Sequence, residues 1–231
     1  MKFDIITIFP EIIQSYLSVG VLGRAIHLKN VLSVDIWNPR DFTKNKHLKV
    51  DDTPYSGGAG MILQIEPIYN TLEEIIKLNP KTKKHIIFFK AGGKIFSQKK
   101  VSEYLEKFDH IIMICGRYEG IDYRVEEFLS NESLSIGEFV LTGGELPAMI
   151  VLDAISRYIP DVLGNTESLS EESHSIDNFL EYPQYSKPTK FVPANPNLVK
   201  NSPKEWVVPE ILYSGNHKEI ENWKKNNSNK N

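Results

Sequence analysis

Three short glycine-bearing loops each follow a strand-like apolar run, and this repetition constrains the fold more than any other feature of the chain. The loops are Lys90–Lys94, Cys115–Gly120 and Leu141–Glu145. Loops at the carboxyl ends of neighbouring parallel strands form the ligand crevice of an open α/β sheet, and glycine lets the backbone approach a flat ligand closely. A single loop of this kind is more often an ordinary tight turn. Three of them after successive strands favour one shared ligand site.

The apolar pattern predicts the α/β arrangement that such a site requires. The runs Ile86–Phe89 and Ile111–Ile114 are continuously apolar, as parallel strands buried on both faces should be. Strand-like and helix-like runs alternate through 1–160, which predicts a mainly parallel sheet covered by helices. The expected strands are 3–9, 32–37, 85–89, 111–115 and 134–136, and the expected helices are 11–17, 67–78, 98–107, 123–129 and 145–158.

The character of the sequence changes after Pro160, which ends the last of these helices. Residues 164–181 are polar and acidic, and six of the thirteen prolines fall between Pro183 and Pro209. Proline disfavours helix in the residue before it, so this stretch is predicted to be extended. Asn216 is a candidate cap for a short final helix that contains Ile220 and Trp223.

The amino-acid composition limits the class of protein and the cellular compartment that we expect. The chain of 231 residues, with 41% hydrophobic and 25% charged residues, is typical of globular proteins. Its one cysteine, Cys115, excludes an internal disulfide framework. Asp4 and Pro10 interrupt the apolar N-terminal stretch, so we expect neither a signal peptide nor a membrane span, and we expect a cytoplasmic protein with no membrane partner.

The charge distribution leaves nucleic-acid binding open. A net charge of −3 gives no overall attraction to nucleic acid, yet a local patch can supply phosphate contacts. The segment 40–49 contains four lysine or arginine residues and a histidine. It fits either a solvated loop or an RNA-binding patch.

The glycine loops lack the spacing of phosphate-binding motifs. Gly92-Gly93-Lys94 has neither the serine or threonine nor the spacing of a P-loop, and no GxGxxG opens the first helix. Zinc-ligand spacing and a GxSxG nucleophile motif are also missing. A crevice of backbone amides and apolar side chains instead suits an adenosine-like ligand held by main-chain hydrogen bonds.

Eight segments carry a more specific pattern. They are Gly23–Ala25, Pro39–Phe42, Val50–Tyr55, Gly57–Met61, Ile114–Asp122, Ser135–Leu141, Gly143–Ala148 and Ser214–His217. Together they resemble the bacterial tRNA (guanine-37-N1)-methyltransferases of the SPOUT class, and the resemblance extends from Met1 to about Trp223.

The resemblance implies a fold and an activity. The expected fold is a mainly parallel α/β domain with a C-terminal trefoil knot (1–162), a linker (163–185) and a small tRNA-binding domain (186–231). The family is homodimeric, with each active site formed between two chains. It binds S-adenosylmethionine in the knot and methylates N1 of guanosine 37 in the anticodon stem-loop of tRNAs that have guanosine at position 36.

The resemblance also assigns cofactor contacts, and these agree with the loops identified from the residues. They fall on Phe88, Phe89, Gly116, Ile136, Gly137, Glu138, Phe139, Val140, Leu141, Gly143 and Gly144. For Phe88 and Phe89, simple core packing is the alternative role.

Two further residues receive catalytic roles by resemblance. Guanine N1 carries a proton at neutral pH, so a base must remove it and a cation should stabilise charge at O6. The cation maps to Arg157, whose alternative role is a helical pair with Asp153. The base maps to Glu172, where the family has aspartate; Glu171 is the rival base, and a solvated acidic linker is the plain alternative for both.

The RNA contacts are assigned by the same motifs. Arg24, Arg117 and the segment 40–49 are candidates for RNA phosphates. Asp51, Glu119 and Ser173 are candidates for the guanine pocket, with structural capping as the alternative. Family behaviour suggests that Mg²⁺ assists the reaction, although the sequence identifies no ligand cluster for it.

Several departures from the family leave two other functions open. The first loop reads Lys90-Ala91-Gly92-Gly93 instead of a Ser-Pro-Gln-Gly type, and the chain ends soon after Trp223. Weaker or differently placed tRNA binding is therefore expected. The alternatives are a tRNA-binding protein with lost or weak catalysis, and a related knotted ribose 2′-O-methyltransferase.

Overall fold

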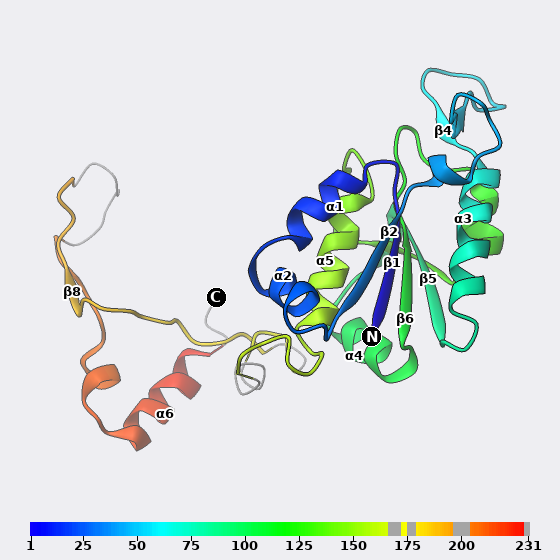
Figure 1. Ribbon diagram of the computed structural model, residues 1–231. Helices are drawn as coiled ribbons and strands as arrows, with labels where there is room; N and C mark the ends of the chain where they lie inside the picture. Colours follow the sequence, from blue (N-terminus) through cyan, green and yellow to red (C-terminus); the bar gives the residue numbers. More distant parts are fainter. Residues whose placement is uncertain (166–171, 175–178, 196–203, 229–231) are drawn as a thin grey trace. The chain divides into compact units, whose positions relative to one another are not determined.

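The chain divides into two compact units. The computed structural model describes residues 1–165, 172–174, 179–195 and 204–228. The first unit is Met1–Gly164 and the second is Asn165–Asn231. Figure 1 follows the chain through both units.

The first unit is built on five parallel strands, which confirms the predicted mainly parallel sheet. The strands lie in the order β2-β1-β6-β5-β7. Their bounds are β1 Lys2–Ile6, β2 Ser33–Trp37, β5 Lys84–Ile95, β6 His110–Ile114 and β7 Glu132–Ser135. A small antiparallel pair, β3 Asp51–Asp52 and β4 Ile62–Leu63, lies outside this sheet.

Alternation along the central strand β6 separates two cores. Ile111 and Met113 belong to one buried cluster, and Ile112 and Ile114 belong to the other. The two-residue period of a strand requires this division, because successive side chains point to opposite faces. All of β6 is buried, which explains its continuously apolar sequence.

Helices cover both faces of the sheet (Figure 1). On one face, buried side chains come from α1 Pro10–Leu17, α2 Gly20–His27, α4 Gln98–Lys107 and α5 Glu145–Ser156. On the other face they come from α3 Ile65–Leu78 and from the π-helical segment Val125–Leu129. Five predicted strands and five predicted helical segments therefore occur, with shifted ends.

Two local differences from the sequence predictions have clear causes. The first strand ends at Ile6 rather than Phe9, because Phe9 caps α1 and Pro10 is its first residue. Helix α2 was not predicted, since two of its eight residues are glycine. A side-chain carbon on Gly23 would lie 2.8 Å from the carbonyl carbon of Ser18, so glycine is required where α2 meets the preceding turn.

A buried polar network joins three strands of the sheet. Asp4 on β1 and His110 on β6 are completely buried and pair with each other. The Trp37 indole N–H donates to Asp4 Oδ1 at 2.8 Å, and Thr82 Oγ1 lies 3.0 Å from His110 Nδ1. Asp4 and His110 thus both have polar partners inside the core, as buried polar groups in a stable protein usually do.

The second unit contains small elements. A hairpin pairs β8 Lys190–Phe191 with β9 Trp206–Val207, and a 3₁₀ turn at Glu210–Tyr213 precedes α6 His217–Asn227. The described parts of the proline-rich stretch contain no helix, as predicted. The predicted helix cap is confirmed, because Asn216 Oδ1 accepts a hydrogen bond from Glu219 N–H at 3.4 Å.

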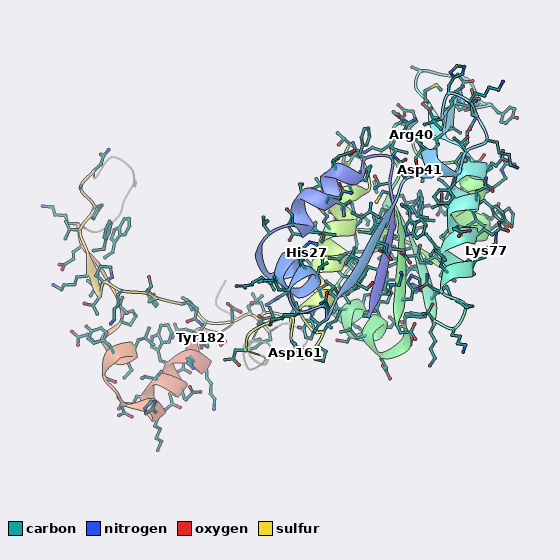
Figure 2. All side chains as sticks on the ribbon, in the orientation of Figure 1. His27, Arg40, Asp41, Lys77, Asp161 and Tyr182 are labelled. Carbon is teal, nitrogen blue, oxygen red and sulfur yellow. The ribbon has the colours of Figure 1, made fainter. Side chains whose placement is uncertain are left out.

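Aromatic contacts hold α6 to the segment that contains Tyr182 and Tyr185. The rings of Tyr182 and Tyr185 each lie 6.3 Å from the Trp223 ring, edge to face, and Figure 2 marks Tyr182. None of the described residues beyond Gly164 is buried. No helix among the described residues of either unit is both long and apolar enough to cross a membrane.

Candidate cofactor pocket and active site

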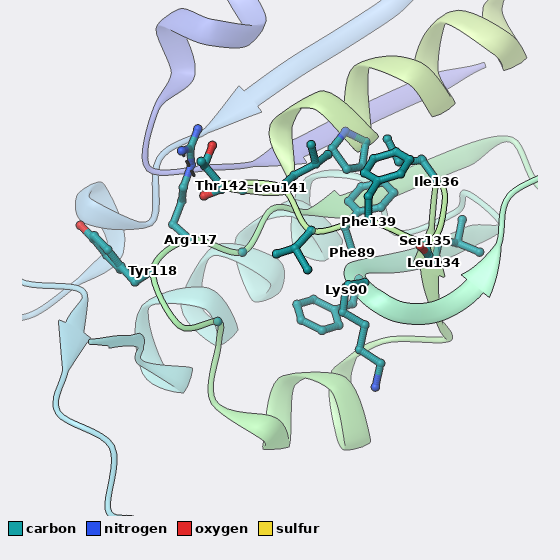
Figure 3. Close-up of a pocket in the computed structure, with 18 of the residues that line it drawn as sticks. Phe89, Lys90, Arg117, Tyr118, Leu134, Ser135, Ile136, Phe139, Leu141 and Thr142 are labelled. Atoms are coloured by element: carbon teal, nitrogen blue, oxygen red, sulfur yellow. Dashed lines mark hydrogen bonds between the residues drawn. The ribbon is translucent and has the colours of Figure 1, made fainter. Parts of the chain in front are cut away.

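A pocket of about 220 Å³ opens at a bulge within β5 and at the carboxyl ends of β6 and β7 (Figure 3). It lies where the three glycine loops come together. Nine of the eleven residues predicted to contact the cofactor line it: Phe88, Phe89, Gly116, Ile136, Phe139, Val140, Leu141, Gly143 and Gly144. Gly137 and Glu138 lie in the same loop but do not line the cavity.

The first wall comes from a bulge in β5. Phe89 and Lys94 both pair with Leu134 on β7, so residues 90–93 loop out between them. A side-chain carbon on Gly93 would lie 2.6 Å from the Leu134 carbonyl carbon. Glycine is therefore required where the strand returns to β7, and the bulge brings Lys90 and Ala91 to the pocket.

The loop after β6 forms the second wall of the pocket and the segment after β7 forms the third, and the two meet at Gly144. Its N–H donates to the Gly116 carbonyl at 2.9 Å, and Arg117 and Gly143 form an isolated antiparallel bridge. A side-chain carbon on Gly144 would lie 2.7 Å from Cys115 Cα, so the backbones touch. The segment after β7 is thus held directly against the loop after β6.

Gly116 differs from these glycines because no protein contact requires it. A side-chain carbon there would lie 3.6 Å from its nearest neighbour, Ile121 Cγ1, which is an ordinary contact distance. Gly116 nevertheless lines the pocket. Its missing side chain leaves room for a ligand, and this space, with apolar rings and exposed main chain around it, fits an adenosine-like group.

An ion pair fixes the mouth of the pocket. Arg117 Nε lies 2.9 Å from Glu145 Oε2, and Glu145 is 1% exposed. Thr7 Oγ1 donates to the other carboxylate oxygen at 2.7 Å, and the Arg117 guanidinium lies 4.8 Å from the centre of the Phe9 ring. Arg117 also donates to the Thr142 carbonyl at 3.2 Å. The side chain predicted to contact RNA phosphate is therefore engaged within the protein, and its RNA role stays a prediction.

Several groups near the pocket have shifted pKa values. Burial, with a contribution from the Glu145 carboxylate, raises the pKa of the Cys115 thiol well above its usual value. Desolvation favours the neutral form of Glu126, yet hydrogen bonds from Lys90 and Ser133 hold the pKa of this carboxyl below its usual value. Cys115 is thus an inert thiol, whereas Lys90 and Glu126 form an ion pair beside the bulge.

Eight further residues line the pocket without having been assigned individually to the cofactor. Five belong to the three predicted ligand loops: Lys90, Ala91, Tyr118, Gly120 and Thr142. The other three, Leu134, Ser135 and Pro147, lie beside those loops and were missed. Tyr118 has a φ of +62°, a left-handed conformation that is rare outside glycine. No sequence signal marks that conformation.

The other residues of the first unit that were predicted to contact RNA or guanine do not gather at one place. Glu119 lines the pocket, and a side-chain carbon on Gly60 would lie 2.5 Å from its Cγ, so Glu119 packs on the 57–60 glycine loop. Asp51 lies on β3, paired with Leu63, and Arg24 is exposed on α2. Neither Asp51 nor Arg24 lines the pocket.

Arg157, the predicted charge stabiliser, lies at the end of α5 beside a second hollow. This hollow is lined by Tyr16, Leu146, Met149, Ile150, Asp153, Ala154 and Arg157. Tyr16 donates to Asp153 Oδ2 at 2.5 Å, and this hydrogen bond raises the pKa of Tyr16 to about 12. Leu146 and Ile150 are 52% and 46% exposed, so the outer face of α5 is apolar and uncovered in one chain.

The predicted base belongs to the second unit. Glu172 and Ser173 are described, whereas the rival base Glu171 lies outside the described residues. Ser173 exchanges hydrogen bonds with Glu181: its N–H donates to Glu181 Oε2 at 3.3 Å, and its Oγ accepts from Glu181 N–H at 3.1 Å. Among the described residues, no group of three or more acidic, histidine or cysteine side chains is arranged to hold a metal ion.

The molecule is an α/β protein with an open parallel sheet. Its glycine loops enclose a pocket at one edge of the sheet, where proteins of this class bind small ligands. The family model described as tRNA (Guanine-1)-methyltransferase TrmD matches residues 1–231. The chain belongs to this family.

Curated relatives named tRNA (guanine-N(1)-)-methyltransferase agree with the family match. One from Clostridioides difficile is 44% identical over 228 residues, which cover 99% of this chain and 92% of the relative. One from Dehalococcoides mccartyi strain CBDB1 is 43% identical over 228 residues, 99% of this chain and 86% of the relative. A third, from Halalkalibacterium halodurans, is 41% identical with the same coverage as the second.

Proposed function

We propose that this protein transfers a methyl group from S-adenosylmethionine to N1 of guanosine 37 in tRNAs that have guanosine at position 36. The observation that carries the proposal is the glycine-edged pocket, which occurs in a chain of the tRNA (guanine-1)-methyltransferase family. The reaction takes place in the cytoplasm, on the anticodon stem-loop.

S-adenosylmethionine, when bound, supplies the electrophilic methyl group. The chain contributes the shape and polarity of its site. Phe88, Phe139 and Leu141 provide apolar walls, and the main chain from Ile136 to Gly144, including Gly137, Glu138 and Val140, provides donors and acceptors for an adenine edge. The space beside Gly116 supports this assignment because no protein group occupies it. Phe89 is also part of the core cluster, so it packs and lines the pocket at once.

Proton removal from N1 is assigned to Glu172. A carboxylate can accept this proton as the methyl group arrives, and a nearby cation stabilises negative charge that develops on O6. Arg157, at the end of the helix that begins at the pocket, is that cation. Glu119, Asp51 and Ser173 are assigned to the guanine pocket and Arg24 and Arg117 to RNA phosphates, while Mg²⁺ is an accessory ion without an assigned site.

We also propose the quaternary and topological features of the family. The exposed Leu146 and Ile150 on α5 support a homodimer, because an apolar helix face beside an active site marks a protein interface. The contact of Gly144 with Cys115 and the Arg117–Gly143 bridge support a trefoil knot that closes around the cofactor. The division is a cofactor domain (1–162), a linker with the base (163–185) and a tRNA-binding domain (186–231).

The test is methyl transfer from labelled S-adenosylmethionine to an unmodified tRNA transcript with guanosines at positions 36 and 37. We expect N1-methylguanosine at position 37, identified by nuclease digestion and mass spectrometry. A transcript with adenosine at position 36 is the matched control and should accept far less methyl. A 2′-O-methylated product would establish the ribose methyltransferase instead, and binding of tRNA and cofactor without transfer would establish the non-catalytic binder.

A further inference from the structure

The hairpin of the second unit presents two aromatic rings to solvent. Phe191 and Trp206 are direct cross-strand partners, and their ring centres lie 5.4 Å apart at 40°. Cross-strand partners share one face of a two-stranded ribbon. Phe191 is 49% exposed and Trp206 is 38% exposed, so the pair forms an outward aromatic surface.

The described residues of the second unit leave this surface partly exposed. None of its described residues is buried, and the neighbouring Val192 and Val207 are 65% and 48% exposed. A large apolar side chain gains about 1.5–3 kcal/mol when it is removed from water. The partly exposed pair therefore offers aromatic area that a ligand can cover.

The charge around the hairpin indicates the nature of that ligand. The described residues of 186–209 include three lysines, Lys187, Lys190 and Lys204, and one acidic residue, Glu205, so they carry three positive charges against one negative. The whole chain, in contrast, has a net charge of −3. Lys190 pairs with Glu205 at 3.1 Å but remains 64% exposed, within reach of solvent and of a polyanion.

We propose that the β8–β9 hairpin is an RNA-binding platform on which Phe191 and Trp206 stack against unpaired bases of the tRNA. Aromatic side chains bind single-stranded bases through their π-faces, and lysines beside them neutralise phosphates. This inference rests on the proposed function for the identity of the nucleic acid. It adds a contact surface outside the cofactor pocket, with residues that no role in methyl transfer requires.

The first test separates stacking from general apolar contact. Replacing both rings in Phe191→Leu/Trp206→Leu keeps apolar side chains but removes the π-faces. We expect the KM for tRNA to rise roughly ten- to hundredfold, as expected for loss of base stacking, with kcat at saturating tRNA within about twofold of wild type. The ring-retaining control Phe191→Tyr/Trp206→Phe should bind tRNA like wild type, and the affinity for S-adenosylhomocysteine should not change in either variant.

A second measurement does not depend on the stability of the hairpin in the leucine variant. Stacking on a base quenches tryptophan fluorescence, so tRNA should quench part of the emission of the wild-type protein. In Trp206→Phe that part should disappear while tRNA affinity is retained. Lys190→Gln/Lys204→Gln should also lower the slope of log K against log salt by up to about 2.

Three outcomes would overturn the inference. The first is an unchanged KM in the leucine variant together with tRNA quenching that persists in Trp206→Phe. The second is full tRNA affinity in the leucine variant, which would show that only apolar area matters. The third is dissociation of a dimer in the leucine variant, which would identify a second copy of the chain as the ligand of the hairpin.

The proposed function can fail separately from this inference. Wild-type protein whose Trp206 emission is quenched by tRNA, but which transfers no methyl group, would refute the function and support the platform. Wild-type protein that forms N1-methylguanosine, with a leucine variant of unchanged KM, would support the function and refute the platform.

Discussion

The two units of the chain differ in how completely they bury their apolar residues. In the first unit, whole strands such as β6 are buried on both faces, and two clusters sandwich the sheet. In the second unit, no described residue is buried, and contacts such as Tyr182 with Trp223 remain partly exposed. The first unit can therefore form its pocket before any ligand arrives, whereas the described residues of the second unit provide little internal packing to stabilise it.

This difference suggests a division of labour. A rigid sheet keeps the glycine loops in place, because close backbone contacts such as Gly144 with Cys115 allow only one arrangement. Regions with few buried contacts open easily and become ordered on binding. We interpret the first unit as the cofactor-binding part and the second as the part that tRNA orders.

The largest loss of activity should come from the second unit, although none of its described residues is buried. Glu172→Gln removes the proposed base, so kcat should fall roughly 10²- to 10⁴-fold, the usual contribution of general base catalysis. Cofactor affinity and the free energy of unfolding should not change. The matched control is Glu171→Gln, which should keep nearly full activity; the reverse pattern would assign the base to Glu171.

Substitutions in the first unit should lower the free energy of unfolding more than substitutions in the second. Ile112→Ala, in the completely buried strand β6, should lower the free energy of unfolding by about 2–5 kcal/mol in urea titrations, because it leaves a cavity in a packed core. Ile220→Ala on α6 should lower it by less than about 1 kcal/mol, since Ile220 is only partly buried. Equal losses of unfolding free energy in the two variants would contradict the proposed difference in packing between the two units.

Gly116 tests whether space in the pocket is reserved for the cofactor. Gly116→Ala should fold normally, because the added carbon meets only an ordinary contact, but it should weaken S-adenosylhomocysteine binding roughly tenfold in calorimetric titrations. Gly92→Ala is the control: it lies in the first loop, no atom would lie within 4 Å of its added carbon, and it does not line the pocket. Undiminished binding in Gly116→Ala would show that the ligand does not use this space.

The smallest effect concerns Cys115 and alkaline pH. Because burial raises its pKa, the folded protein keeps the thiol proton at a pH where the unfolded chain releases it. The resulting stability is fully present below the ordinary thiol pKa of about 8.5–9 and is lost as the pH rises towards the folded value. Between pH 8 and pH 10 this group should lower the free energy of unfolding by about 1 kcal/mol. Cys115→Ala should lack that part of the decline, and an identical pH profile would contradict the assignment.

Elements of the fold that depend on burial could be predicted from the sequence, whereas elements that depend on local backbone geometry could not. The continuously apolar run at Ile111–Ile114 led to a buried parallel strand because burial on both faces dictates such a sequence. Helix α2 and the hairpin were missed, since glycines hid the first and strands of two residues carry no periodicity. The β5 bulge was missed because register depends on contacts with β7 that a single segment does not encode.

The site was predictable where glycine marks a close backbone contact or open space for a ligand, and not where the geometry depends on residues remote in sequence. Gly116, Gly143 and Gly144 were identified and do line the pocket. The ion pair of Arg117 with Glu145, in contrast, joins residues that are remote in sequence, so the sequence assigned Arg117 only as a candidate phosphate contact. The left-handed backbone of Tyr118 is likewise a product of the folded loop.

The most direct test of the division between the units is hydrogen–deuterium exchange of the full chain, first with saturating S-adenosylhomocysteine and then with unmodified tRNA added. We predict that the cofactor product slows exchange in the loops around Phe89, Gly116 and Leu141 and leaves residues 186–227 nearly unchanged. Addition of tRNA should then slow exchange in 186–227, including the β8–β9 hairpin. Equal protection of both regions by the cofactor product alone, or no protection of 186–227 by tRNA, would contradict the account.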